Sequence, residues 1–144
     1  MLGVALRSRT LHMTSERQKR PTDAQLSILT VLWESGPATV RQVHEGLPAQ
    51  VRRGYTTTLK LMQIMTAQGL LSRDESQRSH IYSARRAEAD TQDRLLEDLV
   101  DKAFRGSAAR LALRALSQRR ASSQELAEIR ALLDELERAE GQKK

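Results

Sequence analysis

Apolar positions between residues 22 and 67 recur with the three- to four-residue period of amphipathic helices. A helix is predicted to begin after Thr22, because its hydroxyl can cap the first turn while the Gln25 side chain reaches back to the cap, and to end at Gly36. The same capping pattern at Thr39 and Gln42 predicts a second, shorter helix. The apolar residues expected on the buried faces of these two helices are Leu26, Leu29, Val31, Leu32, Trp33, Val40, Val43 and Leu47.

A third helix is predicted from about Tyr55 to Ala67, with Thr58, Leu61, Met62 and Met65 on its buried side. Its other face is short and polar, which fits a DNA major groove but also an ordinary solvent-exposed face. After Gly69 two short β-prone runs, separated by a charged turn at 74–78, predict a hairpin. Three helices followed by a hairpin with a basic tip indicate a winged helix-turn-helix domain.

From Ala87 onward the pattern predicts further helices, with Gly106 as a C-cap and a capping box of Ser122 and Glu125 before the last helix. Too few residues surround the apolar stripes of these helices to bury them in one monomer, so a second copy is the expected partner. The residues predicted to form the dimer interface are Leu95, Leu99, Phe104, Leu126, Ile129, Leu133 and Leu136.

The expected fold is therefore mainly α, with a winged-helix DNA-binding domain over 21–85 and a helical dimerisation domain over 86–144. Residues 1–20 are expected to be a disordered arm or a product of the chosen start codon, because a second methionine, Met13, lies just before the first organised segment.

The net charge of +6 belongs entirely to the first part of the chain. Residues 1–85 hold 12 Lys and Arg against 6 Asp and Glu, whereas residues 86–144 hold 12 of each kind. This asymmetry is typical of a chain in which one module binds a polyanion and the other has a different function. A soluble protein with a basic surface and no such partner would show the same charge balance.

The composition also limits the alternatives. The chain has no cysteine, which removes disulfides, thiolate metal sites and cysteine nucleophiles. Its three histidines, His12, His44 and His80, lack the spacing of a metal site or an acid–base pair, and no phosphate-binding glycine loop is present. Apolar runs are too short for a membrane span, and no secretory signal is recognised. We therefore expect a cytoplasmic protein that is not an enzyme and needs neither a metal nor a cofactor.

Five runs of residues carry a family resemblance. They are Thr22-Asp23-Ala24-Gln25, Val31-Leu32-Trp33-Glu34-Ser35-Gly36-Pro37, Thr39-Val40-Arg41-Gln42-Val43-His44, Tyr55-Thr56-Thr57-Thr58-Leu59 and Gln68-Gly69-Leu70-Leu71. In combination they resemble the penicillinase-repressor family, which includes the β-lactamase and methicillin-resistance repressors and copper-responsive repressors of Gram-positive bacteria. The resemblance implies a homodimer whose winged helices bind a dyad-symmetric operator in double-stranded DNA.

The resemblance also implies functional positions. Thr56 and Thr57 stand where the family presents polar residues at the start of its recognition helix, Lys60 occupies a place often held by Thr, and Arg78 matches the Arg of the wing. The DNA-contacting residues predicted from the residue pattern and the resemblance are Thr39, Arg41, Arg53, Tyr55, Thr56, Thr57, Lys60, Gln63 and Arg78.

Other positions depart from the family pattern. Gln77 replaces the usual wing glycine, and Ile64 replaces an Arg late in the recognition helix, which leaves the operator sequence open. The family's sensor protease cleaves an Asn-Phe bond, where this chain has Arg114-Ala115, and the cysteine cluster of the copper-responsive members is missing. A membrane sensor protease therefore remains an untested partner, and two alternatives to a repressor stay open: a winged helix that binds protein, and a DNA-binding activator.

Overall fold

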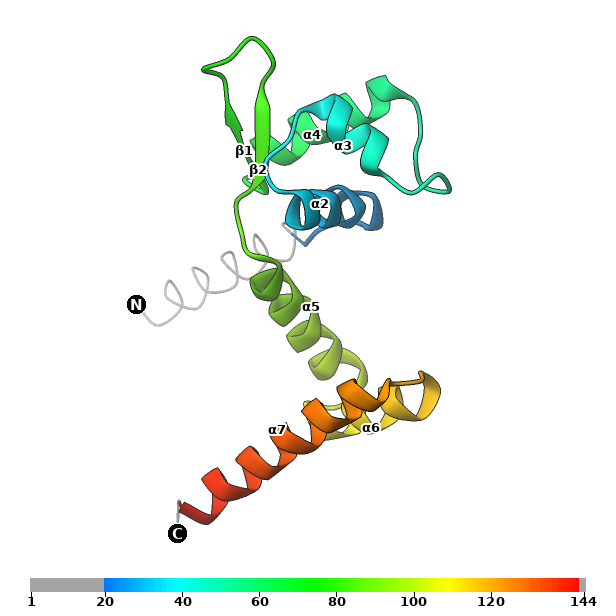
Figure 1. The fold of residues 1–144 in the computed structure, drawn as a ribbon, viewed down its shortest axis with the longest axis vertical. Coiled ribbons are helices and arrows are strands. Elements are labelled where there is room, and N and C mark those ends of the chain that lie inside the picture. The colour runs from blue at the N-terminus through cyan, green and yellow to red at the C-terminus, as the bar shows by residue number, and fades with distance from the viewer. Residues whose placement is uncertain (1–19, 143–144) are drawn as a thin grey trace, which may run out of the picture. The chain divides into compact units, whose positions relative to one another are not determined.

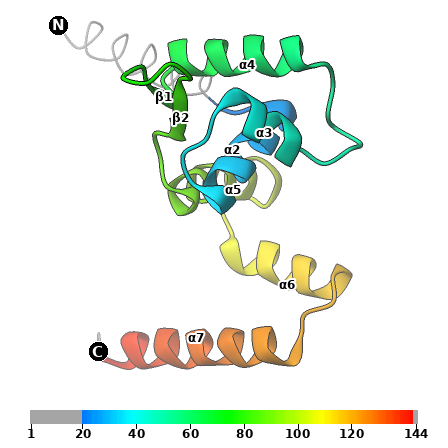
Figure 2. The ribbon, with the colours of Figure 1, turned by 45° about the horizontal axis from the view of Figure 1, so that its top comes forward.

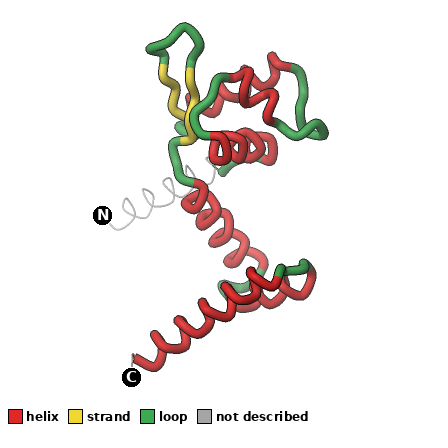
Figure 3. The backbone as a smooth tube through the Cα atoms, viewed as in Figure 1, coloured by secondary structure: helices red, strands yellow, loops and turns green. Residues whose placement is uncertain are grey.

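The computed structural model describes residues 20–142, which divide into two compact units with the boundary after Leu95. The predicted arm at 1–20 lies almost wholly outside the described residues. Helices dominate the described chain, and its two strands form one hairpin (Figure 3). The elements in chain order are α2 (Asp23–Ser35), α3 (Val40–Gly46), α4 (Tyr55–Ala67), β1 (Leu71–Asp74), β2 (Ile81–Ala84), α5 (Glu88–Ala103), α6 (Ala108–Gln118) and α7 (Ser123–Gln142).

Both capping boxes predicted in the first unit are present. The Thr22 hydroxyl accepts a hydrogen bond of 3.2 Å from the Gln25 backbone N–H, and the Gln25 side chain accepts one of 3.0 Å from the Thr22 backbone. Thr39 and Gln42 repeat this exchange at the start of α3. Because each box satisfies two otherwise unpaired backbone donors, the two helices begin where the local sequence predicts. Gly36 ends α2 with a φ of 82°, a conformation that glycine adopts without steric cost.

The three helices and the hairpin enclose one hydrophobic core (Figure 1). The core contains Val40, Val43 and Leu47 from α3 and its C-terminus, and Met62 and Met65 from α4, as the spacing predicts. The first helix differs in part, because Ile28 is buried whereas Leu26 and Trp33 pack against the core from its edge. The buried apolar residues of this core are Ile28, Leu29, Val31, Leu32, Ala38, Val40, Val43, Leu47, Met62, Met65, Leu71 and Tyr82.

A pair of glutamines joins the first and third helices. Gln25 is buried, and its side-chain amide donates a hydrogen bond of 3.0 Å to the Gln68 side-chain oxygen at the C-terminus of α4. A buried amide without a partner costs free energy, so this bond allows Gln25 to cap α2 from inside the domain. The helix start is thereby coupled to the end of the helix that carries the polar face.

The wing is an antiparallel hairpin in which Leu71 pairs with Ala84 and Asp74 with Ile81. The connecting loop spans residues 75–80, later than the turn expected at 74–78. Tyr82 also exchanges two backbone hydrogen bonds with Ala38, of 2.8 and 2.9 Å, so that the link between α2 and α3 lies against the hairpin as a short third strand. These bonds anchor the wing to the helices.

The second unit contains the C-terminal part of α5 together with α6 and α7, and Figure 2 shows α6 and α7 as separate helices joined by a short link. The predicted capping box is present at α7, where Ser122 and Glu125 exchange hydrogen bonds of 2.9 and 3.1 Å. The bond from the Ser122 backbone N–H to the carboxylate lowers the pKa of Glu125. The helix α5 ends at Ala103, three residues before the C-cap predicted at Gly106, and the chain then turns through Arg105 and Gly106, which both have positive φ.

Candidate nucleic-acid interface

The outer face of α4 is polar and exposed. Thr58, Met62 and Met65 point into the core, so residues on the opposite side of the helix face solvent. Thr56, Lys60 and Gln63 share the centre of that outer face, at successive turns of the helix. The arrangement offers a hydroxyl, an ammonium and an amide in one row, which are groups that can bind phosphates or base edges in a major groove.

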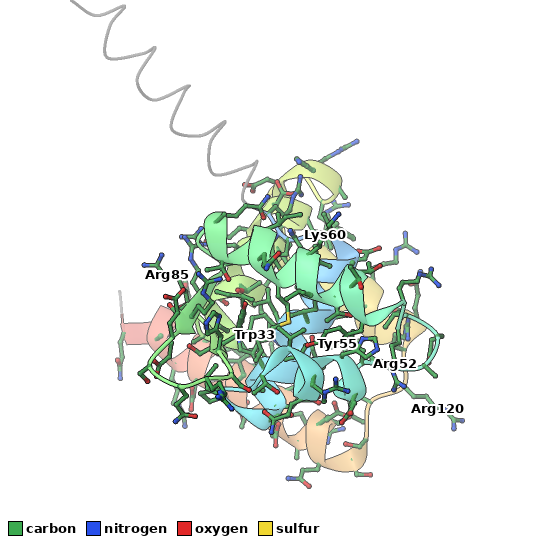
Figure 4. The ribbon with its side chains drawn as sticks, turned by 90° about the horizontal axis from the view of Figure 1, so that it is seen from above. Trp33, Arg52, Tyr55, Lys60, Arg85 and Arg120 are labelled. Atoms are coloured by element: carbon green, nitrogen blue, oxygen red, sulfur yellow. The ribbon has the colours of Figure 1, made fainter. Side chains whose placement is uncertain are left out.

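Tyr55, the first residue of α4, lies on the side of this face that meets α3. Its ring stands edge-on to the His44 ring with 5.7 Å between centroids, and the Arg41 guanidinium lies 5.3 Å from the Tyr55 centroid. Figure 4 shows Tyr55 between α3 and α4, with Lys60 on the other side of α4. The tyrosine is 40% exposed, so α3 holds the ring in place without covering it. Arg41 and Tyr55 therefore pack together as a pair at the edge of the α4 face.

A hydrogen bond of 2.8 Å between the Nδ1 atom of His44 and the hydroxyl oxygen of Thr58 joins α3 to α4 next to the Arg41–Tyr55 pair. Thr58 is buried and His44 is half-buried. His44 therefore contacts both the outward-facing Tyr55 ring and the inward-facing Thr58 hydroxyl, and links α3 to α4 through both contacts.

The loop between α3 and α4 contains an arginine that local sequence patterns did not identify. Arg52 donates hydrogen bonds of 3.2 and 2.9 Å to the backbone carbonyl oxygens of Glu45 and Leu47, at the C-terminus of α3. The negative end of the helix dipole and its unpaired carbonyls explain this position. No short-range motif predicts it, because the contact depends on how the loop folds back. Arg52 thus shapes the loop, whereas its neighbour Arg53 is exposed and forms no side-chain hydrogen bond within the described part of the chain.

Thr57 lies at the edge of the α4 face away from Tyr55. It lines a small hollow of about 210 Å³ together with Arg53, Val51 and residues of α2, including Asp23. Thr57 is exposed on the side of α4 that lines this hollow with α2, so Thr57 and Lys60 occupy different parts of the surface. The structure therefore places Thr56, rather than Thr57, in the row with Lys60.

Side-chain contacts hold most of the charged residues of the wing. The Asp74 side chain accepts a hydrogen bond of 2.9 Å from the Ser76 backbone N–H, and this bond lowers the pKa of Asp74. Arg73 forms an ion pair with Glu75, and hydrogen bonds to Tyr82 and Glu75 raise the pKa of Arg73. Arg78 lies beyond these residues in the loop and is exposed. The cation nearest the tip thus remains available to a partner.

All nine residues predicted to contact DNA belong to the first unit. Thr39 is half-buried, and its hydroxyl is already used as the cap of α3. The remaining predicted residues are exposed and lie on α3, on α4, in the loop before α4 or in the wing. They are Arg41, Arg53, Tyr55, Thr56, Thr57, Lys60, Gln63 and Arg78.

Two packed helices, α3 and α4, followed by a β-hairpin define the winged form of the helix-turn-helix, an architecture of DNA-binding regulators. The family model of the penicillinase repressor matches residues 21–135. The chain therefore belongs to the penicillinase repressor family, and it is a transcriptional repressor with a winged-helix fold.

The chain is also similar to individual proteins and solved structures. The chain is 29% identical over 120 residues to the transcriptional regulator BlaI of two Mycobacterium tuberculosis strains, CDC 1551 and H37Rv, covering 83% of this chain and 86% of BlaI. Among solved structures it is similar to a MarR family protein from Bacillus stearothermophilus, with a TM-score of 0.43, 18% identity and coverage of 97% of this chain and 94% of the other. Bordetella bronchiseptica BpsR gives a TM-score of 0.41 at 18% identity, covering 94% and 93%. Within residues 20–142, no helix is long and apolar enough to span a membrane.

Proposed function

We propose that this chain acts as a homodimer that binds a dyad-symmetric operator in double-stranded DNA and represses transcription there. The observation that carries the proposal is the row of Thr56, Lys60 and Gln63 on the exposed face of α4. The row lies on the second helix of a helix-turn-helix, the element that enters the major groove in this class of domain.

The surroundings of the row supply positioning contacts. Arg41, Arg53 and Arg78 are exposed on α3, in the loop before α4 and in the wing. Arginines at such places bind the phosphate backbone, which sets the orientation of a protein on the duplex without selecting its sequence. The N-terminus of α4 has Gly54 as its cap and no side-chain cap bond; Thr57 and Thr58 donate to the Gly54 carbonyl, so the backbone N–H groups of the first two helix residues are the ones open to a phosphate.

The second unit supports the homodimer. Its helices expose apolar residues that a soluble monomer rarely leaves in water in such number. Four of the seven residues predicted for the interface are exposed and three are half-buried. Four leucines outside the predicted set are also exposed: Leu96, Leu113, Leu116 and Leu132. Because two-fold symmetric dimers use one surface twice, these residues suffice for an isologous interface.

Selection from a random duplex library tests the proposal. The full-length protein should enrich an inverted repeat, and Gln63→Ala should weaken binding to it, whereas the matched control Gln118→Ala, an exposed glutamine at the end of α6, should bind as the unaltered chain does. If no duplex is retained under any salt condition, the domain binds protein instead. A reporter with the selected repeat across its promoter separates a repressor from an activator, because only the repressor lowers its transcription.

A further inference from the structure

An open hollow of about 520 Å³ lies in the corner between the end of α5 and the helix α6. The α6 residues of its lining are Arg110, Leu113, Arg114 and Ser117, which are spaced so that they share one helix face. Phe104, at the end of α5, adds an aromatic surface, and Leu113 is 68% exposed. The remaining lining residues are Ala103 and Arg105, so α7 of the same chain contributes none of them.

The hollow is strongly basic. Residues 105–120 contain five arginines and no carboxylate. Neither Arg110 nor Arg114 forms an ion pair with any of the described residues, and both are exposed. An apolar floor between two unpaired cations suits an occupant that combines apolar groups with negative charge.

The helix α7 has that chemistry. Its 20 residues carry six carboxylates against two arginines. Near its C-terminus, Leu133, Leu136, Glu137 and Glu140 are all exposed and recur at intervals of three and four residues, so they lie on one face. This face therefore presents two leucines and two carboxylates with the same spacing that gives α6 two arginines and a leucine.

We propose that the hollow of each protomer receives the C-terminal half of α7 from a second copy of this chain. Leu133 and Leu136 cover Phe104 and Leu113, while Glu137 and Glu140 pair with Arg110 and Arg114. This proposal rests on the homodimer proposed above and specifies its register. The leucines provide the buried apolar area, and the charges select one alignment of the two helices, because misaligned helices place like charges together.

A charge exchange tests this pairing. One variant carries Arg110→Glu and Arg114→Glu, and the other carries Glu137→Arg and Glu140→Arg. Each variant alone faces like charges at both copies of the contact, so its dimer dissociation constant should rise at least about tenfold. In an equimolar mixture both contacts regain opposite charges, and native mass spectrometry should show the heterodimer as the main species. Circular dichroism of each variant checks that its helices are formed.

Matched controls reverse charges elsewhere on the same elements. Arg119→Glu with Arg120→Glu, after α6, and Glu128→Arg with Glu135→Arg, on another face of α7, should leave the dimer mass unchanged. If both test variants dimerise as tightly as the unaltered chain, the register is overturned although the homodimer stands. A monomeric unaltered chain overturns the homodimer itself and the register with it.

Two further outcomes also overturn the pairing. If the variants dissociate but the mixture does not recover dimers, the charges act within one chain rather than between copies. The hollow could alternatively bind a small organic anion, for which benzoate is the probe. Saturable benzoate binding that Arg110→Glu with Arg114→Glu abolishes, without any change of dimer mass, assigns the hollow to such a ligand.

Discussion

His44 and Thr58 meet at 2.8 Å between α3 and α4, and this contact connects the buried core to the exposed Tyr55 ring. Thr58 is only 3% exposed, so water does not readily replace the imidazole as the partner of its hydroxyl. The orientation of α4 on α3 thus depends on a polar contact as well as on packing.

Replacing Thr58 with Val keeps the shape of the side chain but removes this hydrogen bond. We expect the free energy of unfolding to fall by about 1 to 2 kcal/mol, because His44 loses its partner inside the domain. Urea denaturation followed by circular dichroism measures the change. Thr56→Val, on the exposed face of the same helix, serves as the control and should change the stability little. Equal losses in the two variants would mean that the hydrogen bond contributes nothing specific.

Trp33 offers an internal probe, because it is the only tryptophan of the chain. It packs against the core, and its indole N–H donates a hydrogen bond of 3.0 Å to the Arg86 carbonyl oxygen. This confirms the expectation that Trp33 is a packing residue. We therefore expect its fluorescence to change little when duplex DNA is added. Strong quenching without a change in the circular dichroism spectrum would show that the indole contacts the bases.

The elements that depend on neighbouring residues were predictable from the sequence. The capping boxes at Thr22, Thr39 and Ser122 place three helix starts, because the partners in each box are only three residues apart. The exposed row on α4 follows from the period of its buried residues in the same way. The predicted DNA-contacting and dimer-interface residues remain predictions.

Contacts between distant residues were not predictable in this way. A single residue, Ala38, extends the hairpin through Tyr82, and one residue has no periodicity from which a strand can be recognised. The Arg52 contacts with the α3 carbonyls depend on the path of the loop. The side of α4 on which Thr57 lies depends on how α2 packs beside it. In each case tertiary packing decides what local spacing leaves open.

The proposed homodimer predicts that Leu133→Asp yields monomers. The leucine is 51% exposed in the single chain, and its burial against a partner would place an unpaired carboxylate in an apolar interface. The loss should amount to several kcal/mol of association free energy, and light scattering at micromolar concentration measures the mass. Ala131→Asp adds the same charge to another face of α7 and should leave a dimer. An unchanged mass for Leu133→Asp would place the interface elsewhere.

Lys60 and Arg78 should contribute to DNA binding in different ways. Arg78, in the wing loop, is expected to contact the sugar-phosphate backbone or the minor groove, where a cation gains from the polyanion whatever the sequence. Arg78→Ala should therefore weaken binding to operator and random duplexes by similar factors and reduce the slope of affinity against salt by about one unit. Fluorescence anisotropy titrations at several salt concentrations measure both quantities.

Lys60 lies in the centre of the α4 row, where a side chain that enters the major groove can contact a base edge. Lys60→Ala should cost about 1 to 3 kcal/mol on the operator and less on random DNA, because only the operator presents the matching base. Arg138→Ala, which removes an exposed cation of α7, controls for the general loss of positive charge and should leave both affinities nearly unchanged. If Lys60→Ala instead weakens both duplexes equally while Arg78→Ala spares random DNA, Lys60 positions the protein on the phosphates and the wing contributes the sequence preference.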